Sequence, residues 1–272
     1  MAIIGLKATD PKQLFPISWI CESKAVLDYV YTQKYSTDTS RDILVADFAS
    51  GENDKIPYFF HLILPSILRQ SHSKYGMVPL SFIREKLEER RRFVTYSTDL
   101  HGLRLDSLFH MFQEERILEW SRAVHARLET MELEATFRQP QADYLLKNEG
   151  QQNDLDRRLL EGKGLGEGVF DLGFLNNDVV GYIFEYYKVY TDALASLKAI
   201  RKVMRDESIL LVTQPCSLYP VDNVEVLTDV GFSFVEGKDV DMKTGEMTAI
   251  EEDTDIGTFS QRGHYTFLVF RV

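Results

Sequence analysis

Short apolar segments typical of buried strands alternate with helical segments along most of this chain. Of all its sequence features, this alternation restricts the possible folds most strongly. The strand-like segments are "DILVADF" at 42–48, "FVTYSTD" at 93–99, "GVFDLGFL" at 168–175 and "SILLVTQP" at 208–215. Two further strands, "FSFVE" at 232–236 and "HYTFLVFRV" at 264–272, have no convincing helical segment between them. Alternation with helices indicates parallel strands, whereas the final pair indicates an antiparallel end to the sheet.

We therefore predict an α/β fold: a doubly wound, mostly parallel seven-stranded sheet with an antiparallel last strand. The chain of 272 residues can bury a full core. We predict an N-terminal helical segment over 1–40 and an α/β domain over 41–272. This domain is expected to carry a helical insertion at about 55–90 and a long connection at about 237–263.

The middle of the chain carries a stripe of apolar residues at helical spacing. It predicts one long amphipathic helix from Leu105 to about Met131, followed by a third strand at "ELEATF", 132–137. Another helix is predicted over 183–205. The glycine-rich "GKGLGEG" at 162–168 is followed by a strand rather than a helix, so we interpret it as a loop and not as a phosphate-binding cradle.

The composition narrows the classes of partner and site. The formal net charge of −11 disfavours nucleic acid as a partner, although a local basic patch could still bind it. The two cysteines form no CxxC pair and the six histidines lack ligand spacing, so no metal site is predicted. The apolar core of the first residues is too short for a signal peptide, and no run is long enough to span a bilayer. We therefore expect a cytoplasmic protein.

Polar and small residues follow the predicted strands, where an open parallel sheet binds its ligands. They are Asp47, Ala49, Gly51, Asn53 and Asp54 after the first strand, Asp99 and His101 after the second, Asp143 near the third, and Asn176, Asn177 and Asp178 after the fourth. In isolation each has a plainer interpretation. Asp47 and Asp99 are common residues for a turn at a strand end, and Asn177 or Asp178 could cap the following helix.

Five of these segments, taken in order, resemble class I S-adenosylmethionine-dependent methyltransferases. "VADFASGEND" and "TYSTDLH" are similar to the acidic ends of that family's first two strands, and "FDLGFLNN" resembles its "FDLVFSNN"-type fourth strand. "MRDESILLVTQP" resembles the "LKPGGILLVTEP" step, and "LTDVGFSFVE" the Ala-Gly-Phe step before the sixth strand. The resemblance covers 42–54, 91–101 and 168–272. It implies that the last strand is inserted between its neighbours, and that the cofactor is S-adenosyl-L-methionine.

The resemblance also assigns cofactor-binding residues. They are Asp47, Ala49, Gly51, Asp99, Leu100, Asp143, Leu175 and Asn176. The Asp99 carboxylate is suited to accept hydrogen bonds from the two ribose hydroxyls. Asn176 is placed beside the methionine moiety. Asp143 is a candidate acceptor for the adenine amine, although an ordinary surface aspartate is the alternative.

Three expectations concern the loop after the first strand. Asp47 is expected to orient the backbone N–H groups of the loop rather than to touch the ligand. Gly51 is expected to be essential because the cofactor passes close to bare backbone there. Ala49 and Asn53 replace glycines that are common in the family loop; Ala49 fits if its φ is negative, and asparagine tolerates a positive φ.

The predicted function is methyl transfer by an enzyme whose acceptor is unknown, with a small molecule or a protein slightly favoured over nucleic acid. No catalytic residue is assigned, because the cofactor carries the reactivity. His101 and Tyr182 are expected near the strand ends without an assigned role. A nicotinamide dehydrogenase would need a GxGxxG motif that the loop lacks. The alternative is a non-catalytic binding or scaffold protein that keeps this fold.

Overall fold

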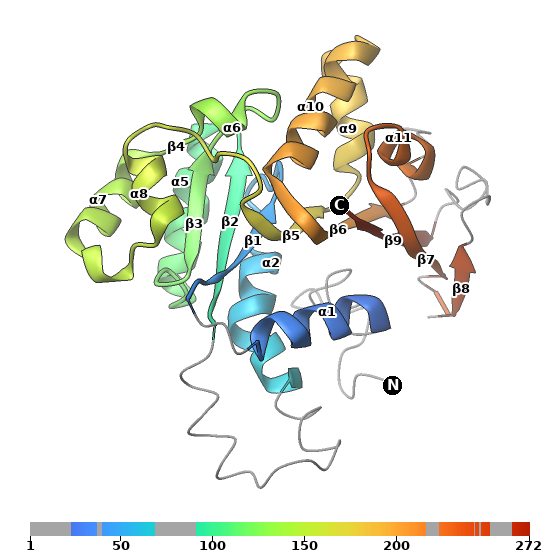
Figure 1. The fold of residues 1–272 in the computed structure, drawn as a ribbon, viewed down its shortest axis with the longest axis horizontal. Helices are drawn as coiled ribbons and strands as arrows, with labels where there is room; N and C mark the ends of the chain where they lie inside the picture. Colours follow the sequence, from blue (N-terminus) through green and yellow to red (C-terminus); the bar gives the residue numbers. More distant parts are fainter. Residues whose placement is uncertain are drawn as a thin grey trace, which may run out of the picture.

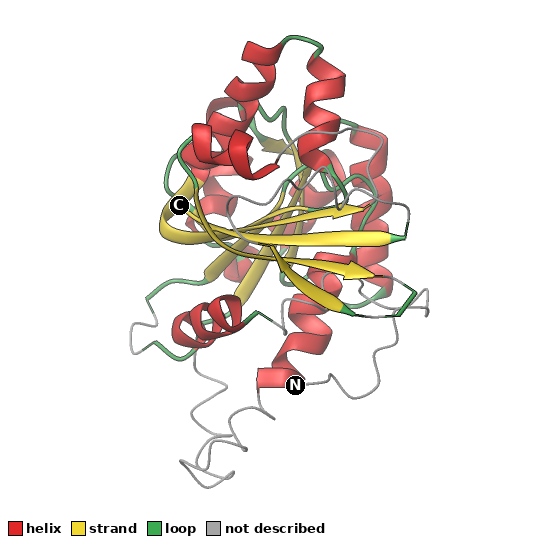
Figure 2. Ribbon diagram, turned by 90° about the vertical axis from the view of Figure 1, so that its right-hand side faces the viewer, coloured by secondary structure: helices red, strands yellow, loops and turns green. Residues whose placement is uncertain are grey.

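The structure, a computed structural model, describes residues 23–36, 40–68, 91–215, 223–241, 243–244, 246–250 and 263–272. Their strands form one mixed sheet with helices on both faces (Figures 1 and 2). The strands are β1 (Ile43–Asp47), β2 (Phe93–Asp99), β3 (Ser121–His125), β4 (Thr136–Phe137), β5 (Phe170–Leu175), β6 (Met204–Pro215), β7 (Ser233–Asp241), β8 (Met247–Ile250) and β9 (His264–Arg271).

The sheet order is β4-β3-β2-β1-β5-β6-β9-β7-β8. Strands β3, β2, β1, β5 and β6 pair in parallel. The last strand, β9, is antiparallel to both β6 and β7 and lies between them. The predicted doubly wound sheet with an inserted antiparallel strand is therefore confirmed. Two short antiparallel strands, β4 and β8, extend its edges.

Helices cover both faces of the sheet, and each face has its own apolar layer. The α-helices are α1 (Lys24–Lys34), α2 (Lys55–Tyr58), α5 (Gly102–Glu114), α6 (Met131–Glu134), α7 (Gln139–Lys147), α8 (Asp154–Leu160), α9 (Val179–Tyr187), α10 (Tyr190–Val203) and α11 (Asn223–Asp229). One apolar layer joins α6 and α8–α11 to the sheet. On the other face of the sheet, α1 and the helical residues 55–68 pack on β1, β5 and β9. No helix within the described ranges is long and apolar enough to cross a membrane.

The prediction of a long helix from Leu105 to Met131 was wrong. The helix α5 ends at Glu114, and Arg116 turns the chain with a φ of 59°. The third parallel strand is β3, "SRAVH", rather than "ELEATF". The "ELEATF" segment instead forms the short helix α6 and the edge strand β4.

A buried arginine explains why β3 escapes detection from the sequence. Arg122, the second residue of the strand, is fully buried, and an apolar residue is the usual choice at such a position. Its guanidinium forms a buried ion pair with Asp156, with Nε 3.0 Å from Oδ1. It also donates to the backbone carbonyls of Leu118 and Gln151. Burial of a charge is tolerated when it is paired and hydrogen-bonded in this way, but no sequence period reveals it.

Other predicted segments differ in their limits. The helix predicted over 183–205 is two helices, α9 and α10, separated at Lys188, which has a φ of 54°. The strand β7 runs into the predicted connection 237–263 and pairs there with β8. Within the predicted insertion, residues 55–68 are helical, and 69–90 lie outside the described residues.

Candidate functional site

A pocket of about 540 Å³ opens at the carboxyl ends of the parallel strands. Strand order reverses at this place: the chain runs from β1 to β2 and β3 on one side, and from β5 to β6 on the other. The lining therefore comes from the segments that follow β1, β2, β3 and β5, together with α9. This is the position at which open α/β sheets bind ligands. We call it the carboxyl-end pocket.

The end of β2 holds the loop that follows β1. The Asp99 carboxylate accepts hydrogen bonds from the backbone N–H of Gly51, at 3.0 Å, and of His101, at 2.7 Å. The N–H of Ser50 donates to the Thr98 carbonyl at 2.8 Å. Since each carboxylate oxygen can accept two hydrogen bonds, Asp99 keeps acceptor capacity toward the pocket that it lines.

Asp47 does not have the role expected of it. Neither of its carboxyl oxygens has a hydrogen-bond partner in the described part of the chain, so it does not orient the loop. Its side chain lines the carboxyl-end pocket although the residue is only 2% exposed. Burial, and then the nearby charge of Asp99, raises the pKa of Asp47 well above its usual range. A buried carboxyl without partners is costly, and a cationic ligand group would relieve that cost.

The backbone of the loop also differs from expectation. Ala49 has a φ of 54°, in the left-handed region, whereas Asn53 lies outside that region. Gly51 has a φ of 64°, and a Cβ added there would come no closer than 3.9 Å to another residue, at the Arg104 guanidinium. The need for glycine at Gly51 therefore comes from the backbone conformation rather than from crowding within the protein.

We predict that Ala49→Gly stabilises the folded chain. A non-glycine residue in the left-handed region costs about 1–2 kcal/mol, part of which is offset because glycine is more flexible in the unfolded chain. The free energy of unfolding should rise by up to about 1 kcal/mol, measured by urea denaturation. Ala46→Gly, in β1 itself, should destabilise instead; a fall in stability for both variants would contradict the strain at Ala49.

The turn after β5 forms a second wall of the pocket. Asn176 accepts a hydrogen bond from the Thr213 hydroxyl at 2.7 Å, and the N–H of Asn177 donates to the same hydroxyl oxygen at 2.9 Å. Asn177 and Asp178 both have a positive φ, 62° and 65°. Asp178 stands at the start of α9, but its side chain makes no capping hydrogen bond. Strained residues gather at functional sites, and Ala49, Asn177 and Asp178 all line this pocket.

A third wall comes from the end of β3 and from α9. Residues 126–129 line the pocket beside Tyr182, Tyr186 and Tyr187. The Tyr187 hydroxyl donates to Glu129, which also pairs with Arg127 at 2.7 Å. Burial, and then this hydrogen bond to Glu129, raises the pKa of Tyr187 to about 12, so its hydroxyl stays protonated at neutral pH. The sequence interpretation missed residues 126–129 because β3 was assigned to a helix.

The structure brings together most, but not all, of the predicted cofactor residues. Asp47, Ala49, Asp99, Leu100 and Asn176 line the pocket, and the N–H of Gly51 is bonded to Asp99. The others are Asp143 and Leu175. Asp143 lies exposed on α7 and accepts a hydrogen bond from Gln139, and Leu175 is fully buried in the core. Neither is among the lining residues.

No group of three or more metal-ligating side chains occurs in the part of the chain that the structure describes. Among the described residues, the histidine that lines the pocket is His101, the residue before α5.

Comparison with known proteins gives similarity in structure but not in sequence. No protein-family model matches the chain, and no curated protein matches it. A TehB-like S-adenosylmethionine-dependent methyltransferase from Corynebacterium glutamicum has a TM-score of 0.44 at 14% identity, over 85% of this chain and 80% of that one. Geranyl diphosphate C-methyltransferase from Streptomyces coelicolor has a TM-score of 0.42 at 8% identity, over 97% and 88%. The [4+2]-cyclase SpnF has 0.45 at 10% identity, over 90% and 80%.

Proposed function

We propose that this protein is an S-adenosylmethionine-dependent methyltransferase that acts on a small molecule. The observation that carries the proposal is the pair of carboxylates in one pocket at the switch point of the sheet. Asp99 is held by two backbone N–H groups, and Asp47 is buried without a partner in the described chain. One suits vicinal hydroxyls and the other suits a positive charge, and the proposed cofactor carries both kinds of group.

The residues of the carboxyl-end pocket fit the cofactor in kind. Asp99 would hold the ribose, with Leu100 beside it as an apolar wall. Asp47 would face a cationic group of the methionine end, and Asn176 would supply polar contacts near it. The left-handed backbone conformation of Ala49 and Gly51 lets the loop turn directly after the end of β1, beside the pocket. The volume of about 540 Å³ lies in the range of small-molecule sites.

The chain contributes binding and orientation to the proposed reaction. When bound, the cofactor supplies an activated methyl group, so the protein needs to align an acceptor and exclude water. The half-exposed rings of Tyr182 and Tyr186 stack at 6.3 Å between their centroids on the pocket side of α9. We assign this surface to the acceptor, because aromatic rings bury an apolar or planar molecule well.

The test of this proposal uses the charge of Asp47. Asp47→Asn keeps the shape but removes the partner for the ligand cation, so affinity for S-adenosylmethionine should fall about ten- to a hundredfold. Because protons compete with the cation for a carboxyl of raised pKa, the wild-type affinity should also rise with pH, and that dependence should be lost in the variant. Calorimetric titrations at several pH values measure both effects.

Glu119→Gln is the matched control, since this exposed carboxylate lies outside the pocket. Its affinity should equal that of the wild type at every pH. Wild-type binding that Asp47→Asn leaves unchanged at every pH would remove Asp47 from the site.

A further inference from the structure

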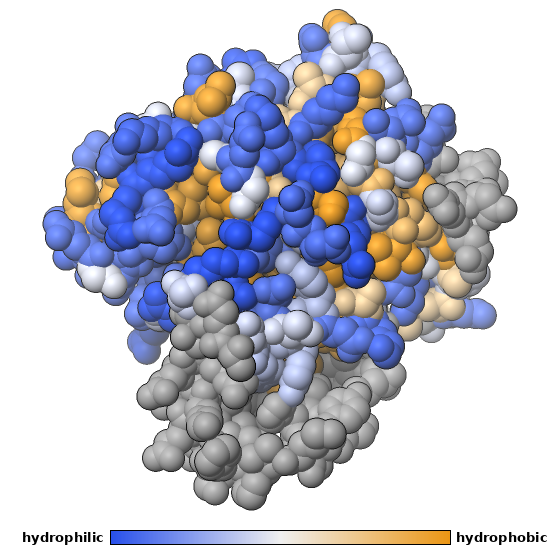
Figure 3. Space-filling model, viewed as in Figure 1, coloured by the Kyte–Doolittle hydropathy of each residue, from blue (hydrophilic) through white to orange (hydrophobic). Residues whose placement is uncertain are grey.

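A second cavity, of about 660 Å³, lies at the amino ends of the parallel strands, where β1, β2 and β5 begin. It is therefore on the opposite side of the sheet ends from the carboxyl-end pocket. Its lining contains six arginines: Arg41, Arg91, Arg92, Arg157, Arg158 and Arg205. Only two acidic residues, Asp42 and Asp154, are among the lining residues of the described chain. We call it the arginine cavity. Figure 3 shows a hydrophilic band across the middle of this face, where the chain enters β1 and β2 in Figure 1.

Two of the arginines are already matched by the two acidic lining residues. Arg92 forms a bidentate pair with Asp42, at 3.0 and 3.3 Å, and lies over the ring of Trp120. Arg157 pairs with Asp154 on the same helix. The charges of Arg92 and Arg157 are therefore already balanced within the protein.

A single buried carboxylate serves three of the others. Asp171 is fully buried, and its Oδ2 accepts from Arg41 at 2.8 Å and from the N–H of Leu44 at 3.0 Å. The Arg205 Nε lies 3.5 Å from Asp171 Oδ1, and Arg91 is 3.9 Å from Oδ2. Arg205 Nε and Asp171 Oδ1 are both buried without a hydrogen-bond partner in the described chain, so they form an ion pair without a hydrogen bond. Arg205 also donates from Nη2 to the Val169 carbonyl at 3.2 Å. Since a guanidinium has five N–H donors and the Arg205 side chain is 38% exposed, it keeps donors beyond these contacts.

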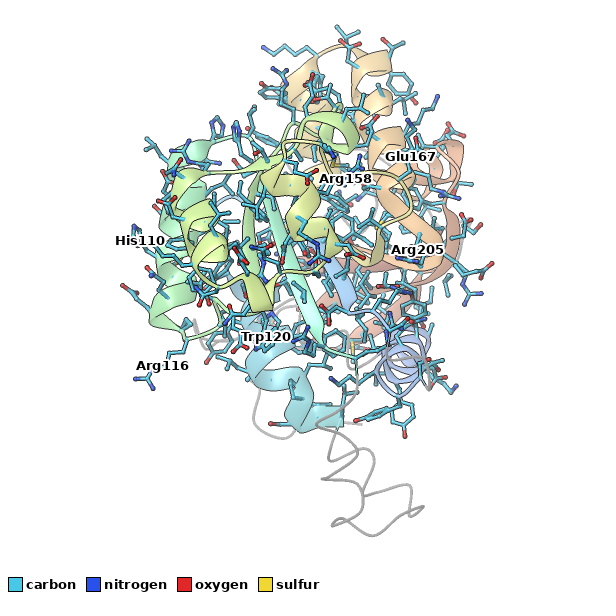
Figure 4. The ribbon with its side chains drawn as sticks, turned by 60° about the vertical axis from the view of Figure 1, so that its left-hand side comes forward. His110, Arg116, Trp120, Arg158, Glu167 and Arg205 are labelled. Carbon is cyan, nitrogen blue, oxygen red and sulfur yellow. The ribbon has the colours of Figure 1, made fainter. Side chains whose placement is uncertain are left out.

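Arg158 differs from the other arginines because no carboxylate is paired with it in the described chain. Its Nε donates to the Gly164 carbonyl at 3.0 Å, and no ion pair to it occurs within the described residues. The acid that closes its helix, Glu161, pairs with Lys163. In Figure 4, Arg158 on α8 and Arg205 at the start of β6 are labelled on the same side of the molecule. Both line the arginine cavity.

The glycine-rich segment 162–168 positions Arg158. A side chain at Gly164 would collide with the backbone of Leu133, 2.4 Å away, so the loop packs there directly on α6. A Cβ at Gly166 would come within 3.1 Å of Arg158 Nε. The backbone N–H groups of Gly166 and Gly168 donate to carbonyls elsewhere and are not free for an anion. The loop therefore supports the arginine rather than cradling a ligand itself.

We propose that the arginine cavity is a second ligand site, which binds the phosphate groups of a small polyphosphate or phosphate ester. Guanidinium groups form paired hydrogen bonds with phosphate oxygens, and Arg158 and Arg205 have donors available for them. The cavity has the volume of a small-molecule site, and Leu155, Leu165 and Val169 add apolar side chains to its lining. It is basic in a chain whose net charge is −11, so its charge is local to this site.

The experiment is a calorimetric titration of the full chain with pyrophosphate, and in parallel with ATP. The wild type should bind at least one of them. Arg158→Gln should weaken that binding about tenfold or more, and the double variant Arg158→Gln/Arg205→Gln about a hundredfold or more. Arg116→Gln makes the same change of charge on an exposed side chain beyond the end of α5 and should have no effect (Figure 4). Saturating S-adenosylhomocysteine should not displace pyrophosphate.

The two ligands distinguish the two sources of phosphate. If the wild type binds ATP more tightly than pyrophosphate, and the double variant loses ATP binding, the ligand is a phosphate ester. If the wild type binds pyrophosphate as tightly as ATP or more tightly, the ligand is an inorganic polyphosphate. If the double variant does not fold, Arg158→Gln decides, since it leaves the contacts of Asp171 intact. Absence of binding by the wild type, or binding that survives every arginine substitution, would overturn the proposal.

Discussion

Replacing Asp99 with alanine should weaken S-adenosylhomocysteine binding by about a hundredfold, which corresponds to about 3 kcal/mol. Two effects combine in this result. The variant loses the acceptors proposed for the ribose hydroxyls. It also releases the backbone N–H groups of Gly51 and His101, which Asp99 holds at 3.0 and 2.7 Å, so the loop after β1 loses its anchor.

Asp99→Asn separates charge from shape. Its amide nitrogen would face one of the two backbone N–H donors, so this variant should also bind more weakly, by about tenfold or more. Asp143→Ala is the matched control, because Asp143 is exposed on α7 and does not line the pocket. Unchanged affinity in both Asp99 variants, with circular dichroism showing an intact fold, would exclude Asp99 from the site.

Gly51→Val should abolish measurable binding of the same ligand. At a φ of 64° a β-branched residue is strongly disfavoured, so the loop must change its path across the mouth of the pocket. Gly51 itself belongs to neither apolar layer, so the sheet should remain folded.

Gly162→Val provides a control with the same type of backbone strain. Gly162 has a φ of 70° and open space around its Cβ position, and it does not line the carboxyl-end pocket. Both variants should lose similar stability in urea denaturation, but only Gly51→Val should lose the ligand. Ligand binding that survives Gly51→Val would show that the conformation of this loop is not needed for the site.

The sheet could be predicted from the sequence because most of its strands are apolar segments with clear ends. The strands β1, β2, β5 and β6 are apolar segments separated by helices, and the Gly231 turn marks the end of α11. The place of β9 between β6 and β7 was implied by the family resemblance rather than by the segment pattern. The strand β3 could not be predicted, since Arg122 and Asp156 form their buried pair between segments far apart in sequence. A strand stabilised by such a pair has no hydrophobic period of its own.

The site was predictable where a residue type follows a strand end, and not where a role depends on three-dimensional contacts. Asp99 and Asn176 reach the pocket because their strands end there. The lack of a hydrogen-bond partner for Asp47 within the described residues, and the positive φ of Ala49, depend on how β2 packs beside the loop, which no local pattern encodes. Residues 126–129 were hidden together with β3.

The arginine cavity could not be predicted from the sequence either. Its arginines come from four separate segments, and only the folded sheet brings the starts of β1, β2 and β6 close to α8. From the sequence, Arg91 and Arg92 belong to the charge run "REKLEERRR", which is typical of a solvated helix face. In the structure Arg91 is buried and Arg92 lies over Trp120.

The central claim is that the carboxyl-end pocket binds S-adenosylmethionine, and titration of the wild-type chain with S-adenosylhomocysteine tests it most directly. The account predicts saturable binding with one ligand per chain, measured by calorimetry, and a matching rise in thermal stability that is absent in Asp99→Ala. A folded wild-type chain that shows neither saturable heat nor a shift in its unfolding temperature would contradict the claim. That result would instead favour a non-catalytic binding protein built on this fold.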